Sequence, residues 1–270
     1  MNAIDKNFVK KSFNASAAVY DQYAGLQKSM LRQLVPFIGC TGMPVSRVLD
    51  IGMGTGNLTE RLQTCFPAAR VHGCDIAEKM LLCAREKLAP CRQSFFAAAD
   101  AEFLPYRAGS FELVVSNFAY QWIDHWGRAL SEIQRVLKPG GVFVFSAFGA
   151  RTFLELRQSY NKACMEKQYT GGRALDLLLT REKIKAVFAR HGFGQSCFRT
   201  FSVVENYSSV NDVLRSIKGM GARNASPARN RTPGVRRVLA RMMELYEKDF
   251  SISNRIPVTF EIIMAKGHKQ

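Results

Sequence analysis

The segment Val48-Leu-Asp-Ile-Gly-Met-Gly-Thr-Gly-Asn57 constrains the fold of this sequence more than any other feature. A strand-like run ends in Asp50, and Gly52, Gly54 and Gly56 follow at every second position. Glycines at such a place let the chain turn tightly from a strand into a helix and let a ligand approach the backbone. The spacing differs from the G-x-G-x-x-G pattern typical of nicotinamide sites. The segment therefore predicts a ligand site at the end of a strand.

Strand-like and helical stretches alternate from about residue 45 to residue 150. The expected strands are Ser46–Ile51, Arg70–Ile76, Ser94–Ala98, Leu113–Asn117 and Gly141–Phe148, and the expected helices are Asn57–Cys65, Glu78–Leu88 and Trp126–Leu137. This alternation is typical of a parallel sheet covered by helices, which binds ligands at the carboxyl ends of its strands. We therefore predict an α/β fold with a doubly wound, Rossmann-like sheet.

The second half of the chain has a different order and spacing of expected helices and strands. It contains the expected helices Thr152–Lys167, Arg181–His191 and Val210–Gly219, a further helix that ends near residue 249, and the strands Cys197–Tyr207 and Pro257–Ala265. About fifty residues separate these two strands, too many for a plain loop. The sheet is thus expected to be seven-stranded and mostly parallel, with a helical insertion before the last strand.

Three parts follow from this pattern. Residues 1–44 are expected to form an N-terminal helical lid and residues 45–150 the ligand-binding core. Residues 151–270 should complete the same domain, with substrate- or partner-binding insertions at about 151–178 and 208–253.

The basic residues are concentrated in the second half. The chain has 38 lysines and arginines against 22 acids, and residues 151–270 hold 22 of the basic residues but only 10 of the acids. Residues 215–241 contain eight basic residues and no acid. Such a field attracts an acidic partner, although a solvated basic loop is the plain alternative.

Several classes are excluded by what the sequence lacks. No apolar stretch approaches the roughly 18 residues of a membrane-spanning helix, and the N-terminus lacks the apolar core of a secretory signal. The seven cysteines include no C-x-x-C pair, which argues against a disulfide framework and a zinc site. We expect free thiols in a reducing cytoplasm, no membrane association and no metal.

Acidic residues mark the ends of three successive strands. Asp50 precedes the glycines, Asp75 closes the second strand and Asp100 follows the third. A carboxylate at the second position can accept both hydroxyls of a ribose. Three carboxylates at one edge suit an adenosine that bears a positive charge better than a pyrophosphate, which they would repel.

These features together resemble the class I S-adenosylmethionine-dependent methyltransferases. The resemblance rests on Val48–Asn57, on Asp75, on Ala99-Asp-Ala101 and on Leu137-Lys-Pro-Gly-Gly141. It implies S-adenosyl-L-methionine as cofactor and S-adenosyl-L-homocysteine as product. The cofactor-binding residues that it implies are Gly52, Gly54 and Gly56 for the methionine part, Asp50 to steady their loop, Asp75 for the ribose, Asp100 for the adenine amino group beside the backbone of Ala101, and Asn117 facing the sulfonium. Ile76 is implied as a further cofactor-binding residue. Met53 stands where alanine or cysteine is more usual, a departure expected to change packing.

Three further segments resemble the malonyl-[acyl-carrier protein] O-methyltransferases of biotin synthesis. They are Phe13–Ala24, Ser116–Trp122 and Leu214–Ala222, and the likeness extends from about residue 4 to residue 265. It implies methylation of the free carboxylate of a malonyl thioester, carried by an acidic acyl carrier protein or by coenzyme A. It also implies that the N-terminal lid closes over the site, with Tyr20 and Tyr23 pointing inward. The substrate-side residues expected from it are Tyr20, Trp122, Arg215 and Lys218, of which the last two, three residues apart on one helix, would anchor the carboxylate.

Other interpretations are retained. The basic half also suits an RNA or DNA methyltransferase. Two observations argue against it. Asn117-Phe-Ala-Tyr120 is not the Asn-Pro-Pro-Tyr motif of amino-methylating enzymes, and Pro90-Cys91, which resembles the nucleophile of cytosine-5 methyltransferases, lies before the third strand rather than after the fourth. Another small-molecule methyltransferase and a non-catalytic adenosine-binding protein are further alternatives. Tyr20 and Trp122 could be ordinary core residues, and Arg215 with Lys218 an ordinary solvated helix face.

Overall fold

The computed structural model describes residues 4–39, 41–89, 94–170, 179–219 and 234–270. Its centre is one seven-stranded sheet with the order β3-β2-β1-β4-β5-β7-β6. The strands are β1 Arg47–Ile51, β2 Arg70–Asp75, β3 Ser94–Ala98, β4 Phe111–Asn117, β5 Leu137–Phe148, β6 Phe193–Tyr207 and β7 Ile256–Lys269. β1 to β5 pair in parallel, and β7 runs antiparallel between β5 and β6. The predicted sheet is confirmed.

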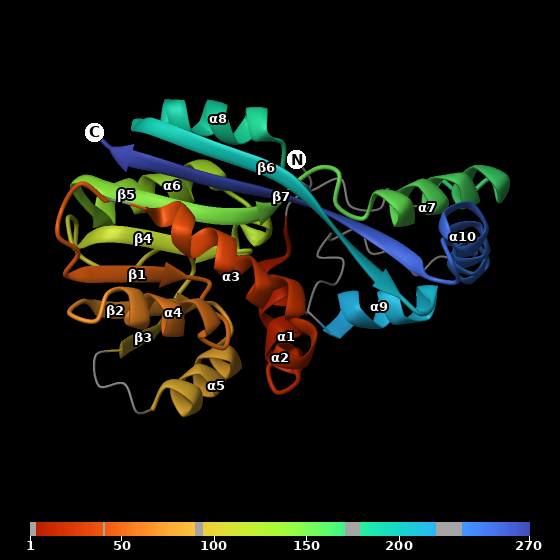
Figure 1. Cartoon of the computed structure of the whole chain (residues 1–270), viewed down its shortest axis with the longest axis horizontal. Coiled ribbons are helices and arrows are strands. Elements are labelled where there is room, and N and C mark those ends of the chain that lie inside the picture. Colours follow the sequence, from red (N-terminus) through yellow and green to blue (C-terminus); the bar gives the residue numbers. More distant parts are fainter. Residues whose placement is uncertain (1–3, 40, 90–93, 171–178, 220–233) are drawn as a thin grey trace.

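Helices cover both faces of the sheet because side chains of each strand alternate between two apolar cores. The longer helices are α1 Lys6–Ser16, α3 Gly25–Ile38, α4 Asn57–Cys65, α5 Glu78–Leu88, α6 Trp126–Val136, α7 Leu154–Glu166, α8 Arg181–Arg190, α9 Val210–Gly219 and α10 Val235–Phe250. Val48 lies in one core with residues of α3 and α4, whereas its neighbour Leu49 lies in the other with residues of α6 and α8. These two pairs of helices lie on opposite faces of the sheet (Figure 1).

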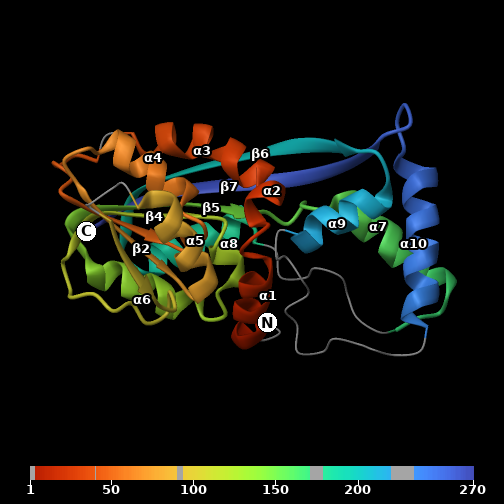
Figure 2. The same ribbon diagram turned by 90° about the horizontal axis from the view of Figure 1, so that it is seen from below.

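The N-terminal helices lie at the end of the sheet where the parallel strands finish. α1 and the single turn α2, Tyr20–Tyr23, cross this end before α3 begins (Figures 1 and 2). Asp5 caps α1 by accepting a hydrogen bond from the N–H of Phe8, and the N–H of Ile4 donates to Asp124 Oδ1 at 3.0 Å. The first residues of the described chain are thereby tied to the loop before α6.

The antiparallel pair β6 and β7 extends well beyond the parallel core. β5 pairs with β7 only as far as Ile262, whereas β6 pairs with it as far as Ile256. We call this extension, residues 256–261 with their partners in β6, the antiparallel arm. α7, α9 and α10 gather at its far end (Figure 1), and Val258 and Phe260 of the arm are buried among them.

The largest differences from the expected boundaries lie in strands β5 to β7. β5 begins at Leu137, which pairs with Phe111, rather than at the expected Gly141, so the Pro-Gly-Gly segment lies within an irregular part of the strand. β6 begins at Phe193 rather than Cys197 because Phe193 pairs with Lys269 near the end of β7. No helix within the described ranges is long and apolar enough to cross a membrane.

Candidate active site

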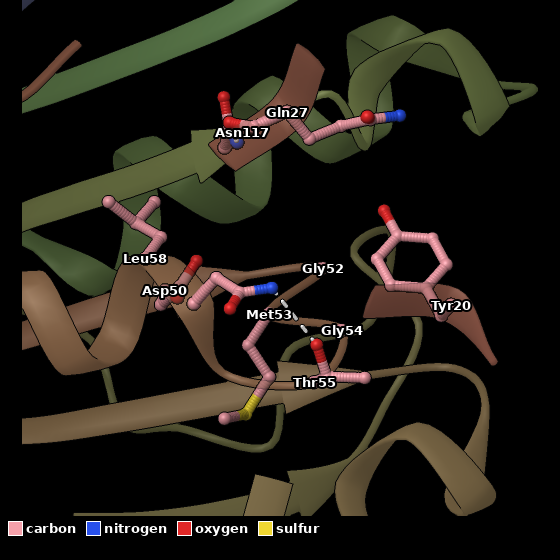
Figure 3. Close-up of a pocket in the computed structure, with 10 residues that line it drawn as sticks. Tyr20, Gln27, Asp50, Gly52, Met53, Gly54, Thr55, Leu58 and Asn117 are labelled. Atoms are coloured by element: carbon pink, nitrogen blue, oxygen red, sulfur yellow. Dashed lines mark hydrogen bonds between the residues drawn. The ribbon is translucent and has the colours of Figure 1, made fainter. Parts of the chain in front are cut away.

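A pocket opens at the carboxyl ends of β1 and β4 (Figure 3). Five residues predicted from the sequence line it, namely Tyr20, Asp50, Gly52, Gly54 and Asn117. The other lining residues are Gln27, Met53, Thr55, Asn57 and Leu58.

The glycine loop leaves no room for side chains at two of its positions. All three glycines have positive φ, from 56° to 84°, where other residues are strained. A Cβ on Gly52 would lie 2.3 Å from the Cβ of Ala119, and one on Gly56 would lie 2.8 Å from Leu88 Cδ1. The loop is therefore held against its neighbours, and its open side faces the pocket.

Met53 fills the space behind this loop. Its side chain packs with Leu81, Ala84 and Leu88 of α5 and lies against Gly73 of β2, which has no side chain to meet it. This residue, which departs from the usual motif, thus packs on α5 and also lines the pocket.

Asp50 is buried at the base of the pocket with one oxygen engaged. Its Oδ2 accepts a hydrogen bond from Thr59 Oγ1 at 2.7 Å, whereas its Oδ1 has no hydrogen-bond partner within the described part of the chain. Burial raises the pKa of Asp50 to about 7, although the bond from Thr59 opposes the shift. A buried carboxylate with a bare oxygen is costly unless a donor or a cation reaches it. The site thus favours a positively charged ligand.

Asp75 is held by backbone N–H groups rather than by side chains. Its Oδ2 accepts from the N–H of Gly54 at 2.9 Å and its Oδ1 from the N–H of Ala77 at 2.8 Å. Burial raises the pKa of Asp75, and hydrogen bonds from the N–H groups of Ala77, Gly54 and Ile76 counteract part of the shift. Because a carboxylate has about four acceptor positions, these bonds leave capacity for a ligand hydroxyl. Ile76 follows directly, at the end of β2.

Asp100 contacts the N-terminal helix. Its carboxylate lies 2.6 Å from Lys6 Nζ and accepts from the N–H of Glu102 at 3.0 Å. Lys6 also lies 2.6 Å from the buried carboxylate of Glu102. The acid expected to bind an adenine amino group, with Ala101 beside it, is thus already paired with a lysine of α1. Sequence analysis did not anticipate this pair, since ninety-four residues separate its members.

Asp21 joins α2 to the glycine loop and was missed from the sequence. Its Oδ1 accepts from Thr55 Oγ1 and Asn57 Nδ2, both at 2.8 Å, and its Oδ2 lies 3.3 Å from Lys87 Nζ. Burial opposes ionisation, yet these hydrogen bonds and the lysine charge lower the pKa of Asp21. The side chains that bind it are part of the glycine motif, but nothing local to Asp21 indicates the contact.

Tyr20 and Asn117 approach the pocket from opposite sides (Figure 3). The pKa of Tyr20 is raised by burial and by the charge of Asp75, so its hydroxyl remains protonated and able to donate. Asn117 Oδ1 accepts from Ser146 Oγ at 2.6 Å, and its Nδ2 donates to the Gln27 carbonyl at 3.3 Å. These contacts fix the side-chain amide of Asn117 at the end of β4.

The other substrate-side predictions do not line this pocket. Trp122 packs edge-on against Phe13 of α1, with ring centroids 5.7 Å apart. Arg215 lies on α9 with 72% of its side chain exposed and Nη1 2.7 Å from Asp212 Oδ1, and Lys218 is exposed on the same helix. Much of the basic run, including residues 220–233, lies outside the described residues.

The arrangement suits a cationic nucleoside. Asp50 offers a bare buried oxygen, Asp75 retains acceptor positions for a ribose, and the glycine loop leaves its open side to the ligand. S-adenosylmethionine, with its sulfonium, ammonium and ribose groups, fits these residues. Within the described ranges, no group of three or more histidine, cysteine or acidic residues is placed to hold a metal ion.

The strand order and this pocket define the class I methyltransferase fold. Residues 49–145 match a family described as a methyltransferase domain. The chain is also similar to a phosphoethanolamine N-methyltransferase from Haemonchus contortus, solved in complex with S-adenosyl-L-methionine, with a TM-score of 0.58 and 20% identity over 95% of this chain and 57% of that one.

Relatives over the full length identify the family. The chain is 38% identical to a malonyl-[acyl-carrier protein] O-methyltransferase from Geobacter sulfurreducens, covering 98% of this chain and 100% of the relative. It is 32% identical to a bifunctional biotin biosynthesis protein from Teredinibacter turnerae, covering 95% of this chain and 46% of the relative. The chain belongs to the malonyl-[acyl-carrier protein] O-methyltransferase family.

Proposed function

We propose that this enzyme transfers a methyl group to the free carboxylate of a malonyl thioester carried by acyl carrier protein, at the start of pimeloyl formation for biotin. The single observation that carries this proposal is the extent of the similarity. The methyltransferase domain accounts for residues 49–145, but relatives that act on malonyl-[acyl-carrier protein] match 98% of the chain. The similarity to these relatives therefore extends to α7, α9 and α10, which lie outside residues 49–145.

The reaction needs no general base. The malonyl carboxylate is ionised at pH 7 because carboxyl pKa values lie near 4. When bound, S-adenosylmethionine supplies an electrophilic methyl group, and a carboxylate oxygen takes that methyl as the carbon–sulfur bond breaks, which leaves S-adenosylhomocysteine and a methyl ester. No proton moves. The protein's contribution is then to align the two reactants and to exclude water.

We assign the two sides of the reaction to different parts of the chain. Residues 45–150 would hold the cofactor through Asp50, Asp75, Asp100 and the glycine loop, with residues 1–44 as a lid over it. Residues 151–270 would bind the acyl carrier protein. Support comes from the pocket in the first part and from the helices at the end of the antiparallel arm.

We further propose Arg215 and Lys218 as the carboxylate anchor, with Tyr20 and Trp122 enclosing the acyl group. The exposed side chain of Arg215 is available for an incoming carboxylate once it leaves Asp212, a surface pair of the kind that contributes little to stability. Exposed Arg236 and Arg237 on α10 provide positive charge for an acidic carrier protein. The free thiols of the described cysteines agree with a cytoplasmic location.

One experiment tests the function. The purified protein is incubated with methyl-labelled S-adenosylmethionine and, in parallel, with malonyl carrier protein, malonyl coenzyme A, acetyl carrier protein or RNA. We expect label on the malonyl thioesters, released by mild alkali as a methyl ester should be. Acetyl carrier protein is the matched control because it lacks the free carboxylate. Label on the acetyl form or on RNA alone would contradict the proposal.

A further inference from the structure

The last residue of α9 makes an unusually close contact with the lid. A Cβ built on Gly219 would lie 2.4, 2.5 and 2.6 Å from three ring atoms of Tyr23, Cγ, Cδ2 and Cδ1. These atoms belong to the base of the ring, which moves less than its hydroxyl end. The views from two directions agree that α2 and α9 are neighbours (Figures 1 and 2). Only glycine permits this approach.

The backbone conformation does not itself require glycine at position 219. Gly219 is the last residue of α9, and its φ does not lie in the left-handed region that favours glycine. The contact with Tyr23 is a physical reason for the absence of a side chain at this position.

α2 contacts three functional elements through one turn. Tyr20 lines the cofactor pocket, Asp21 accepts hydrogen bonds from Thr55 and Asn57 of the glycine motif, and Tyr23 lies against α9. Because Tyr20 and Tyr23 share this one turn, a displacement of Tyr23 would also shift Tyr20.

The contacting face of α9 also carries the proposed carboxylate anchor. Arg215 and Gly219 are four residues apart, so they lie on one face of the helix. The distance between the anchor and the cofactor pocket thus depends on how closely α9 approaches α2. We infer that Tyr23 and Gly219 form a positioning pair that sets this distance and aligns the malonyl carboxylate with the methyl donor.

This inference rests on the proposed function and predicts a specific defect. An added methyl group at position 219 must separate α9 from Tyr23 by about 1 Å to restore an ordinary 3.4 Å contact. Because a misplacement of about 1 Å can lower a rate by about 100-fold, we expect Gly219→Ala to lower kcat/KM for malonyl carrier protein by roughly 10- to 100-fold. The affinity for S-adenosylhomocysteine should fall much less than kcat/KM, because Asp50, Asp75 and the glycine loop are retained.

Two further variants separate positioning from general damage. Gly25→Ala is a matched control, because Gly25 is also helical and nothing lies within 4 Å of a Cβ built there. Tyr23→Ala removes the ring that Gly219→Ala would strike. We therefore expect Tyr23→Ala with Gly219→Ala to be no worse than Tyr23→Ala alone, whereas independent defects would multiply.

Amide hydrogen exchange provides a measurement that does not depend on the substrate. S-adenosylhomocysteine should slow exchange in the peptide spanning α9 of the wild type and of Gly25→Ala, but not of Gly219→Ala. The positioning role of Tyr23 and Gly219 would be contradicted by losses of kcat/KM that multiply in the double variant. It would also be contradicted if S-adenosylhomocysteine still slowed amide exchange in α9 of Gly219→Ala. A wild type that shows this coupling but leaves malonyl carrier protein unlabelled would contradict the proposed function and leave the contact intact.

Discussion

Replacing Asp50 by asparagine should change how the stability of the cofactor-free protein depends on pH. The free energy of unfolding of the variant should rise relative to that of wild type as the pH rises. In the folded protein burial raises the pKa of this carboxyl from 3.8 to about 7. A carboxyl pKa that is higher in the folded than in the unfolded protein means that folding favours the protonated carboxyl. The contribution of Asp50 to the free energy of unfolding is therefore complete at pH values below the pKa of the unfolded chain, and it is lost as the pH rises toward 7. From these two pKa values and about 1.36 kcal/mol per unit, wild type should lose about 2 to 3 kcal/mol relative to Asp50→Asn between pH 5 and pH 8.

The amide also has a penalty that does not vary with pH. The substituted side chain would still accept from Thr59, but its NH₂ group would occupy the place of the bare Oδ1, and a buried unpaired donor costs about 1–3 kcal/mol. The informative quantity is therefore how the difference in free energy of unfolding between Asp50→Asn and wild type changes with pH, and not its value at one pH.

Urea unfolding of the cofactor-free protein at several pH values measures this quantity. Asp249→Asn is the control, because the hydrogen bond from Lys162 lowers the pKa of Asp249 and its contribution should be constant between pH 5 and pH 8. Asp50→Asn should also lose most of its affinity for S-adenosylmethionine. A stability difference that stays constant from pH 5 to pH 8 would refute the assignment of Asp50 as a buried, incompletely paired acid.

Other predictions concern the cofactor, the chemistry and the partner. Asp75→Ala should weaken S-adenosylmethionine binding by about 1.5–3 kcal/mol in calorimetry, the range for a charged acceptor, and unchanged affinity in a folded variant would contradict its role. At saturating cofactor, single-turnover methyl transfer should be nearly independent of pH from about 6.5 to 8.5, because the nucleophile is already ionised; a one-proton rise would require a titrating general base. Arg215→Ala should impair malonyl carrier protein and a short malonyl thioester alike, since both present the same carboxylate. Reversing Arg236 and Arg237 to glutamate should raise KM several-fold for the carrier protein alone and only at low salt, where charges are weakly screened; equal losses on both substrates would exclude steering.

The cofactor half was predictable because its signals are local. The glycine spacing, the acids at strand ends and the alternation of strands and helices lie within short stretches of sequence, and the structure places Asp50, Gly52 and Gly54 around one pocket. Parallel strands bring their carboxyl ends to one edge whatever the details of the loops. Sequence alone therefore located this edge and five of the ten residues that line the pocket.

Contacts between distant segments were not predictable. The pairs Lys6 with Asp100, Asp21 with Thr55 and Tyr23 with Gly219 each join the lid to residues that periodicity cannot relate to it. Tyr23 was expected to point into the site, yet it lies against α9. The lengths of β6 and β7 were underestimated because their ends are specified by pairing with each other rather than by an alternating pattern.

The position of β7 in the sheet also determines when the two halves of the enzyme can form. β7 follows every other described element along the chain, yet it lies between β5 and β6. During synthesis β6 has no neighbour to pair with until residues 256–269 have emerged, and the helices at the end of the arm lack their support. Strands β1 to β5 are complete by Phe148 and can assemble earlier, since chains fold progressively from the N-terminus. Under the proposed division of the chain, the nascent protein would complete its cofactor-binding strands first and its carrier-protein-binding part only once β7 has formed.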